Sequence, residues 1–212
     1  DVHFDIPRDS DGKPITMWNL IPKKLIPPTR TSRYCCKELK ESAGAGYVTI
    51  TGVRHAESTN RKKNKGLINI GNSKKNNIIL NYDDDEARRM VEHCYRTRRV
   101  MLNPIIDWED SDVWEFIRGY GVPYCDLYDC GYKRLGCIGC PMGTRAGTEL
   151  DAYPKYKENY IRAFNKMLDA RREKKLPIYE TWQTGDDVMD WWLRETKVTD
   201  ENQIDIFEED KP

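Results

Sequence analysis

Two pairs of closely spaced cysteines have the residue type and the spacing of a metal or cluster site. Cys35 and Cys36 are adjacent, and Cys137 and Cys140 form a Cys-x-x-Cys motif about a hundred residues later. Thiolates are soft ligands that suit zinc and iron–sulfur clusters. Zinc favours two Cys-x-x-Cys pairs, and an adjacent pair is a less natural tetrahedral donor. We therefore expect the four thiols to hold a cluster, with zinc as the alternative.

Two further cysteines, Cys125 and Cys130, bracket a short acidic segment in a chain that has seven cysteines in all. An odd number of cysteines, in a chain where we expect no secretory leader, favours metal binding or redox chemistry over disulfide scaffolding. The thiolate is the reactive form of cysteine, and a cationic setting would favour it. Cys125 and Cys130 are therefore candidate catalytic thiols, with simple packing as the alternative.

Basic residues are concentrated between positions 23 and 65, although the whole chain has 35 Lys and Arg and 35 Asp and Glu. A basic stretch beside the first cysteine pair fits a multiply charged anion such as a nucleotide, a sulfate or a nucleic-acid backbone. A solvated basic face is the alternative. The sequence has no apolar run of about 18 residues that could span a membrane. We expect a cytoplasmic protein with no membrane partner.

These side chains need strands and helices to position them. In residues 47–54, apolar and polar side chains alternate and several are β-branched, which predicts a central strand. Its carboxyl end carries Arg54 and Glu57, and open α/β sheets bind ligands at that end. Residues 100–106 predict a second strand and residues 59–81 a mobile excursion. Residues 35–42, 85–98, 110–119 and 153–168 predict helices, and Phe116 is expected on the buried side of the third. Trp182, Trp191 and Trp192 indicate a last packing patch before an acidic tail.

Four motifs follow one another in a fixed order. They are Pro28-Thr29-Arg30-x-x-Arg33-Tyr34-Cys35-Cys36-Lys37, Gly52-Val53-Arg54-x-x-Glu57-Ser58-x-x-Arg61, Asn103-Pro104-Ile105-Ile106-Asp107-Trp108, and Gly131-Tyr132-x-Arg134-x-Gly136-Cys137-x-x-Cys140-Pro141. As a set, this series resembles the phosphoadenosine phosphosulfate (PAPS) and adenosine phosphosulfate reductase family. The resemblance implies an α/β fold of the adenine nucleotide α-hydrolase type, with a parallel twisted sheet and helices on both faces. A helical C-terminal region would follow it.

The resemblance also implies ligands. In the cluster-bearing branch of the family, a [4Fe–4S] cluster would be held by Cys35, Cys36, Cys137 and Cys140. A nucleotide or oxyanion site would be formed by Arg30, Arg33, Arg54, Glu57, Ser58 and Arg61. Arginine suits this role because its guanidinium recognises phosphate and sulfate in a bidentate manner. His55 follows Arg54 directly and is a further catalytic candidate, with a surface loop histidine as the alternative.

The sequence departs from the family pattern in two places. The Ser-Gly-Gly-x-Asp-Ser phosphate loop is missing, and the chain has no Gly-Gly pair. We expect that an N-terminal strand–loop–helix unit has been cut off or is supplied by another segment. No cysteine follows Cys140, whereas assimilatory reductases use a nucleophilic cysteine near the C-terminus.

We therefore expect residues 1–150 to form an N-terminally incomplete nucleotide-binding and cluster domain, and residues 151–212 a helical extension. The leading hypothesis is an iron–sulfur protein that binds an adenylyl nucleotide (PAPS, adenosine phosphosulfate or ATP) for sulfur reduction or sulfur transfer. One alternative is an ATP-pyrophosphatase-type sulfurtransferase that modifies nucleic acid, and another is a non-catalytic nucleotide-sensing or scaffold subunit. The expected partners are an adenine nucleotide, a thiol or electron-donor protein, nucleic acid in the second hypothesis, and other subunits of an oligomer or complex.

Overall fold

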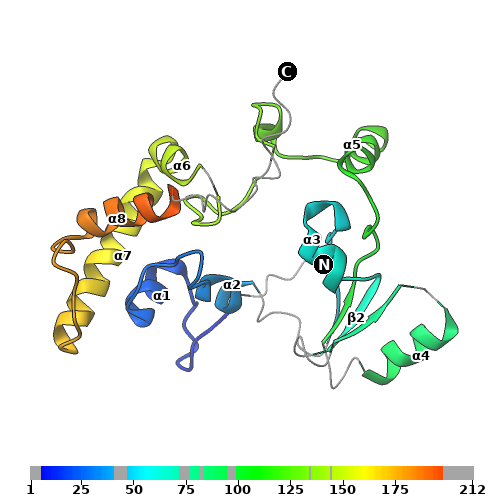
Figure 1. Cartoon of the computed structure of the whole chain (residues 1–212), viewed down its shortest axis with the longest axis horizontal. Helices are drawn as coiled ribbons and strands as arrows, with labels where there is room; N and C mark the ends of the chain where they lie inside the picture. Colours follow the sequence, from blue (N-terminus) through cyan, green and yellow to red (C-terminus); the bar gives the residue numbers. More distant parts are fainter. Residues whose placement is uncertain are drawn as a thin grey trace. The chain divides into compact units, whose positions relative to one another are not determined.

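The computed structural model describes residues 6–40, 47–71, 77–81, 84–94, 99–133, 135–143 and 145–197 (Figure 1). The chain forms two compact units. The first combines Asp1–Ser42 with Arg134–Pro212, and the second is Ala43–Lys133. The expected boundary at residue 150 lies inside helix α6 (Ala146–Ala152) of the first unit. The division into domains at residues 1–150 and 151–212 stays a prediction, because compact units and functional domains need not coincide.

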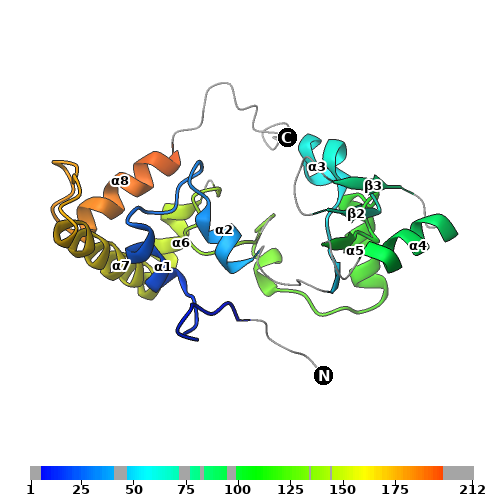
Figure 2. The same ribbon diagram turned by 90° about the horizontal axis from the view of Figure 1, so that it is seen from below.

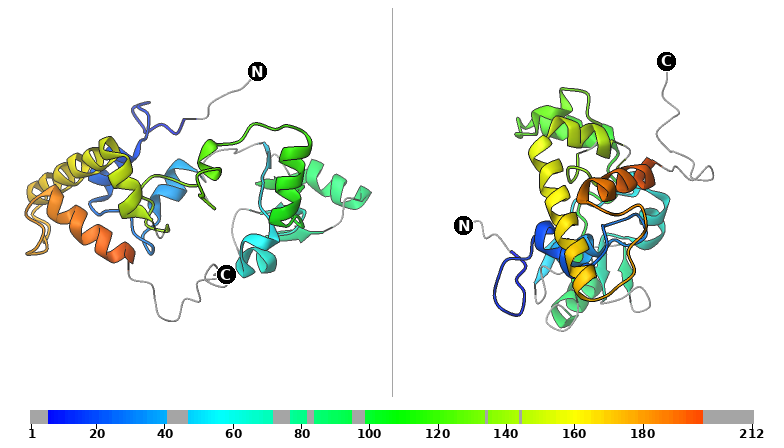
Figure 3. Two further views of the ribbon diagram at one scale, coloured as in Figure 1. Left: turned by 90° about the horizontal axis from the view of Figure 1, so that it is seen from above. Right: turned by 90° about the vertical axis from the view of Figure 1, so that its left-hand side faces the viewer.

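The first unit is helical. Its elements are α1 (Met17–Lys24), α2 (Tyr34–Leu39), α6 (Ala146–Ala152), α7 (Pro154–Glu173) and α8 (Gly185–Lys197). The long helix α7 begins with a proline, which suits a first helical position because its missing N–H would have no partner there. Helices α1 and α8 both pack against α7 (Figures 2 and 3).

The core of the first unit lies between these three helices. Its buried side chains include Ile21, Leu150, Tyr160, Ala163, Phe164, Met167, Leu168, Trp182, Val188, Met189 and Trp192. The indole N–H of buried Trp192 donates to the Pro28 carbonyl at 2.5 Å, so a helix near one end of the chain is tied to the segment just before α2. The predicted helical region and tryptophan patch are confirmed.

The second unit contains a four-stranded sheet. Its strands are β1 (Val48–Ile50), β2 (Ile68–Ile70), β3 (Ile78–Leu80) and β4 (Val100–Leu102), in the order β1-β4-β2-β3. The pair β1 and β4 is parallel, and the pairs β2–β4 and β2–β3 are antiparallel. The helices of this unit are η1 (His55–Glu57), α3 (Thr59–Asn64), α4 (Asp85–Cys94), α5 (Asp110–Gly119) and η3 (Asp126–Tyr128). The α/β class is confirmed, and the described sheet is mixed.

The structure corrects three local expectations. The strand expected in the centre of the sheet is β1, which lies at an edge of the described sheet and leaves Ile50 71% exposed. Residues 59–81 contain α3, β2 and β3, where an excursion was expected; residues 72–76 lie outside the described residues. Helix α5 forms as predicted, but Phe116 is 43% exposed where the helical pattern predicts burial.

No helix in the described ranges is both long enough and apolar enough to cross a bilayer.

Candidate functional site

Both predicted cysteine pairs belong to the first unit. Cys35 and Cys36 lie at the start of α2, and Cys137 and Cys140 lie in the turn that precedes α6. Burial is the main reason that the pKa of the Cys35 thiol is raised to about 11, and Cys36 and Cys140 raise it further. The side chain of Arg30, five residues before Cys35, donates to the carbonyl of Pro141, which follows Cys140, so the two cysteine segments lie close together in the folded chain.

Two predicted oxyanion-binding arginines lie beside these cysteines. Arg33 directs Nη2 to the sulfur of Cys36 at 3.6 Å, and Arg30 donates from Nε to the Pro141 carbonyl at 3.1 Å. A guanidinium next to a thiolate stabilises the charged form of the sulfur. Arg33 therefore contacts a cysteine of the first pair, and Arg30 contacts the residue that follows the second pair. Their predicted role in nucleotide binding stays a prediction.

The four thiols fit a cluster in donor chemistry, since they are soft ligands from two segments of one unit. None of the four is in a disulfide. However, in the part of the chain that the structure describes, no three His, Cys, Asp or Glu side chains are grouped as they would be around a metal ion. Cluster binding through Cys35, Cys36, Cys137 and Cys140 therefore stays a prediction.

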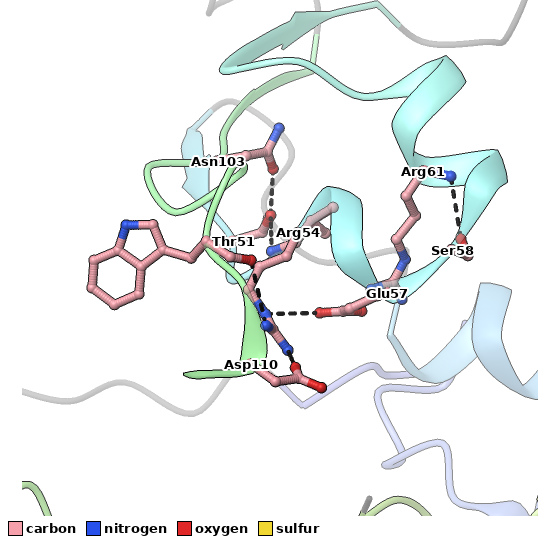
Figure 4. A network of polar contacts seen from close by, with 9 residues as sticks. Thr51, Arg54, Glu57, Ser58, Arg61, Asn103 and Asp110 are labelled. Carbon is pink, nitrogen blue, oxygen red and sulfur yellow. Dashed lines mark hydrogen bonds and ion pairs between the residues drawn. The ribbon is translucent and has the colours of Figure 1, made fainter. Parts of the chain in front are cut away.

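A network of charged side chains follows β1 in the second unit (Figure 4). Arg54 places Nη2 2.6 Å from Oδ1 of Asp110 and Nε 3.7 Å from Oε1 of Glu57. Glu57 also forms an ion pair with Arg61. Ser58 is the N-cap residue of α3, and its hydroxyl accepts a hydrogen bond from the Arg61 backbone N–H at 3.2 Å. The four predicted oxyanion-site residues Arg54, Glu57, Ser58 and Arg61 are thus brought together by η1 and α3.

Buried asparagines support this network from the sheet. Asn103, which follows β4, is completely buried and donates from Nδ2 to the Gly66 carbonyl at 2.6 Å and to Oδ1 of Asn69 at 3.0 Å. Thr51 donates its hydroxyl hydrogen to Oδ1 of Asn103 (Figure 4). These bonds fix the end of β1 relative to β2 and β4. Asn69 could not be singled out from the sequence, because a single polar residue between two isoleucines resembles an exposed position of a strand.

The catalytic candidates have different surroundings. His55 is held at both ring nitrogens, with Nδ1 3.1 Å from Oδ1 of Asp107 and Nε2 2.9 Å from the Lys65 carbonyl oxygen. Cys125 and Cys130 are exposed on either side of η3. The structure therefore gives His55 fixed partners and leaves the two thiols open to solvent. Their catalytic roles stay predictions.

Comparison with known proteins shows that the chain is similar to one domain family and to several individual proteins. Residues 31–143 match the phosphoadenosine phosphosulfate reductase domain. An uncharacterised protein of Methanocaldococcus jannaschii is 30% identical over 159 residues, which are 72% of this chain and 32% of that protein. An adenosine 5'-phosphosulfate reductase of Oceanobacillus iheyensis is 28% identical over 111 residues, which are 50% of this chain and 36% of that enzyme. One from Neisseria meningitidis is 44% identical over 50 residues, which are 24% of this chain and 20% of that enzyme.

The chain thus spans between a fifth and little more than a third of the length of these relatives. No solved structure matches it. The domain match covers more than half of the chain and includes both cysteine pairs and the Arg54–Arg61 network. The chain therefore belongs to the phosphoadenosine phosphosulfate reductase domain family.

Proposed function

We propose that this chain is an iron–sulfur member of the family that binds an adenylyl nucleotide and acts in sulfur reduction or sulfur transfer. The observation that carries the proposal is that both cysteine segments belong to the first unit, where the Arg33 guanidinium donates to the sulfur of Cys36. Relatives named adenosine 5'-phosphosulfate reductase favour a sulfonucleotide as the ligand. PAPS, adenosine phosphosulfate and ATP are the three nucleotides to be tested.

Cys35, Cys36, Cys137 and Cys140 would hold a [4Fe–4S] cluster. Such a cluster supplies one-electron chemistry whose potential depends on charge and hydrogen bonds around its sulfurs. Arg33 offsets the negative charge of the thiolates and donates to one of them. In a reductive reaction, an external thiol or electron-donor protein would supply the electrons.

Arg54 and Arg61 would bind the phosphate or sulfate oxygens of the nucleotide. Both share the Glu57 carboxylate, which holds the guanidinium groups in place before a ligand arrives. The Arg54 side chain is 14% exposed, whereas that of its other partner, Asp110, is 83% exposed. An incoming oxyanion would take the place of Asp110 on Arg54, and the released Asp110 carboxylate would rotate into the solvent. The arginine would then form charge-assisted hydrogen bonds without first being ordered.

Anaerobic purification followed by an absorption spectrum and assays of iron, sulfide and zinc tests the cluster. We expect broad visible absorption and roughly four irons and four sulfides per chain, as a [4Fe–4S] cluster requires. The double variant Cys137→Ser/Cys140→Ser should lose the iron. The matched control Cys125→Ser/Cys130→Ser should keep it. One zinc and no colour in the wild-type protein would contradict the proposal.

Calorimetry with PAPS, adenosine phosphosulfate and ATP then identifies the reaction class. Tight binding of either sulfonucleotide favours sulfur reduction. Binding of ATP alone favours the alternative in which oxygen is activated by adenylylation so that sulfur can replace it. If none of the three binds to the cluster-loaded protein, the nucleotide part of the proposal is wrong.

A further inference from the structure

Three side chains from different segments hold the backbone of the Cys137–Cys140 turn. Glu149 of α6 accepts a hydrogen bond at Oε2 from the Gly139 N–H at 2.9 Å. Tyr160 of α7 donates its hydroxyl hydrogen to the Ile138 carbonyl at 3.3 Å. Directly after the turn, Arg30 donates to the Pro141 carbonyl. The peptide groups between and just after the two cysteines are thus fixed by side chains rather than by a strand or a helix.

The turn has little freedom to adopt another conformation. Gly139 has a φ of +70°, a left-handed conformation that favours glycine. A Cβ at this position would lie 3.0 Å from a methyl carbon of Leu150, a core residue of α6. Gly139 is buried, so its N–H would have no water to replace the Glu149 carboxylate. Neighbouring residues of one helix, Glu149 and Leu150, therefore fix the turn by a hydrogen bond and by packing.

Tyr160 is fixed by the core. Tyr160 is 4% exposed, and its ring packs against Trp18 and Trp192, with centroid distances of 5.0 and 4.9 Å. This packing holds the Tyr160 hydroxyl in place to donate to the Ile138 carbonyl of the turn.

We propose that Glu149 and Tyr160 are positioning residues that hold the Cys137–Cys140 turn ready for the cluster, and that the Glu149 carboxylate also lowers the reduction potential of that cluster. This inference rests on the proposed cluster binding. Partners that orient metal ligands contribute strongly to metal affinity. A fixed negative charge beside a cluster that is itself negative makes it harder to add an electron, so the potential falls.

Two variants of one residue separate the two roles. Glu149→Gln keeps an oxygen that can accept from Gly139 but removes the charge, whereas Glu149→Ala removes both. After anaerobic reconstitution, Glu149→Gln should hold as much iron as the wild type, with a midpoint potential shifted upward. Glu149→Ala should bind iron about 10- to 100-fold more weakly, the loss that follows removal of a group that orients a metal ligand. Tyr160→Phe, which retains the ring, should weaken iron binding in the same direction.

Glu158→Gln is the matched control, because Glu158 is an exposed glutamate of α7 in the same unit. It should change neither iron content nor potential. If Glu149→Ala behaves like the wild type in both readouts while the wild type carries its cluster, this inference is wrong and the proposed function stands. If the wild type takes up no iron, the proposed function fails, and the charge effect fails with it.

Amide hydrogen exchange on the metal-free protein decides the positioning role independently. The Gly139 amide should exchange slowly in the wild type and in Glu149→Gln, and much faster in Glu149→Ala, because its acceptor is lost. Equal exchange in all three proteins would overturn the positioning role.

Discussion

Arg54 and Asp110 form an ion pair in which the arginine side chain is largely buried and the aspartate side chain is largely exposed. Nη2 of Arg54 lies 2.6 Å from Oδ1 of Asp110, and the arginine has a second carboxylate partner in Glu57. Asp110 is the first residue of α5 and is largely exposed. Glu57 therefore orders the Arg54 side chain, and the exposed Asp110 carboxylate is the partner that a ligand anion would replace in the proposed site.

Substitutions at this pair should change nucleotide affinity in opposite directions. Arg54→Ala should weaken binding of the preferred nucleotide by about 10- to 100-fold, because hydrogen bonds to charged groups are worth about 1.5–3 kcal/mol. Asp110→Asn should strengthen binding by about two- to fivefold, since an exposed ion pair is worth at most about 1 kcal/mol. Calorimetry measures both. Glu115→Gln, an exposed acid of the same helix, should leave the affinity unchanged. Unchanged affinity in Arg54→Ala would remove Arg54 from the oxyanion site.

Cysteine alkylation should divide the thiols into two groups. In cluster-loaded protein, iodoacetamide should label the exposed residues Cys125 and Cys130 and should spare the four proposed ligands. Removal of the iron by oxidation and chelation should then make those four reactive, because a thiol bound to iron cannot attack the reagent. Peptide mass spectrometry identifies each site. Fast labelling of Cys137 in protein that still carries its iron would show that the ligand assignment is wrong.

Glycine substitutions near the turn should have opposite effects on stability. Gly139→Ala should lower the free energy of unfolding by about 1–3 kcal/mol, since an alanine would adopt a left-handed conformation against Leu150. Gly147 lies inside α6 with no atom near its Cβ position, so Gly147→Ala should raise stability by about 0.5–1 kcal/mol. Urea unfolding compares the two. Equal stability of Gly139→Ala and the wild type would show that the turn is free to rearrange.

The start of α8 should lose stability in acid. The Asp187 carboxylate accepts hydrogen bonds from Thr184 at its backbone N–H and its hydroxyl, at 2.7 and 2.8 Å, and these bonds hold the pKa of Asp187 below its ordinary value of 3.8. The pKa of Asp187 is lower in the folded state than in the unfolded state. These hydrogen bonds therefore contribute their full stability above the unfolded-state pKa, and that contribution is lost as the pH falls through the folded-state pKa.

Thermal melts of the wild type and Asp187→Asn across this range provide the measurement. The difference in melting temperature should be constant near neutral pH and should shrink below about pH 4, where the wild-type carboxylate begins to take up a proton. Thr184→Ala should lower the melting temperature at every pH, because it removes the N-terminal cap of α8. A difference between wild type and Asp187→Asn that does not change with pH would contradict this assignment.

Long periodic segments could be predicted from the sequence, and short ones could not. Helix α7 has 20 residues with an apolar stripe, and its core positions Tyr160, Phe164 and Met167 follow from that period. Strands β2 and β3 have three residues each and lie among Lys and Asn, so the two apolar side chains of β2 and the three of β3 give no period to detect.

The cysteines of the proposed cluster site could be singled out from the sequence, whereas the side chains that hold their backbone could not. Cys35, Cys36 and the Cys-x-x-Cys pair are recognisable because few other functions place thiols at that spacing. Glu149 lies nine residues beyond the second pair in an ordinary helix, and no local pattern marks it as the partner of the Gly139 N–H. Its role depends on the tertiary packing of α6 against the turn, which the local sequence does not indicate.

The discontinuity of the first unit has a consequence for biosynthesis. The residues of the second unit lie between its two segments, so Cys35 and Cys36 leave the ribosome well before Cys137 and Cys140. At about 5–20 residues per second, the intervening stretch takes on the order of 5–20 s to synthesise. During that interval, the first two thiols have neither their partner thiols nor helices α7 and α8 of the same unit. A nascent chain would therefore depend on a reducing environment until α8 has been made and Trp192 can donate to the Pro28 carbonyl.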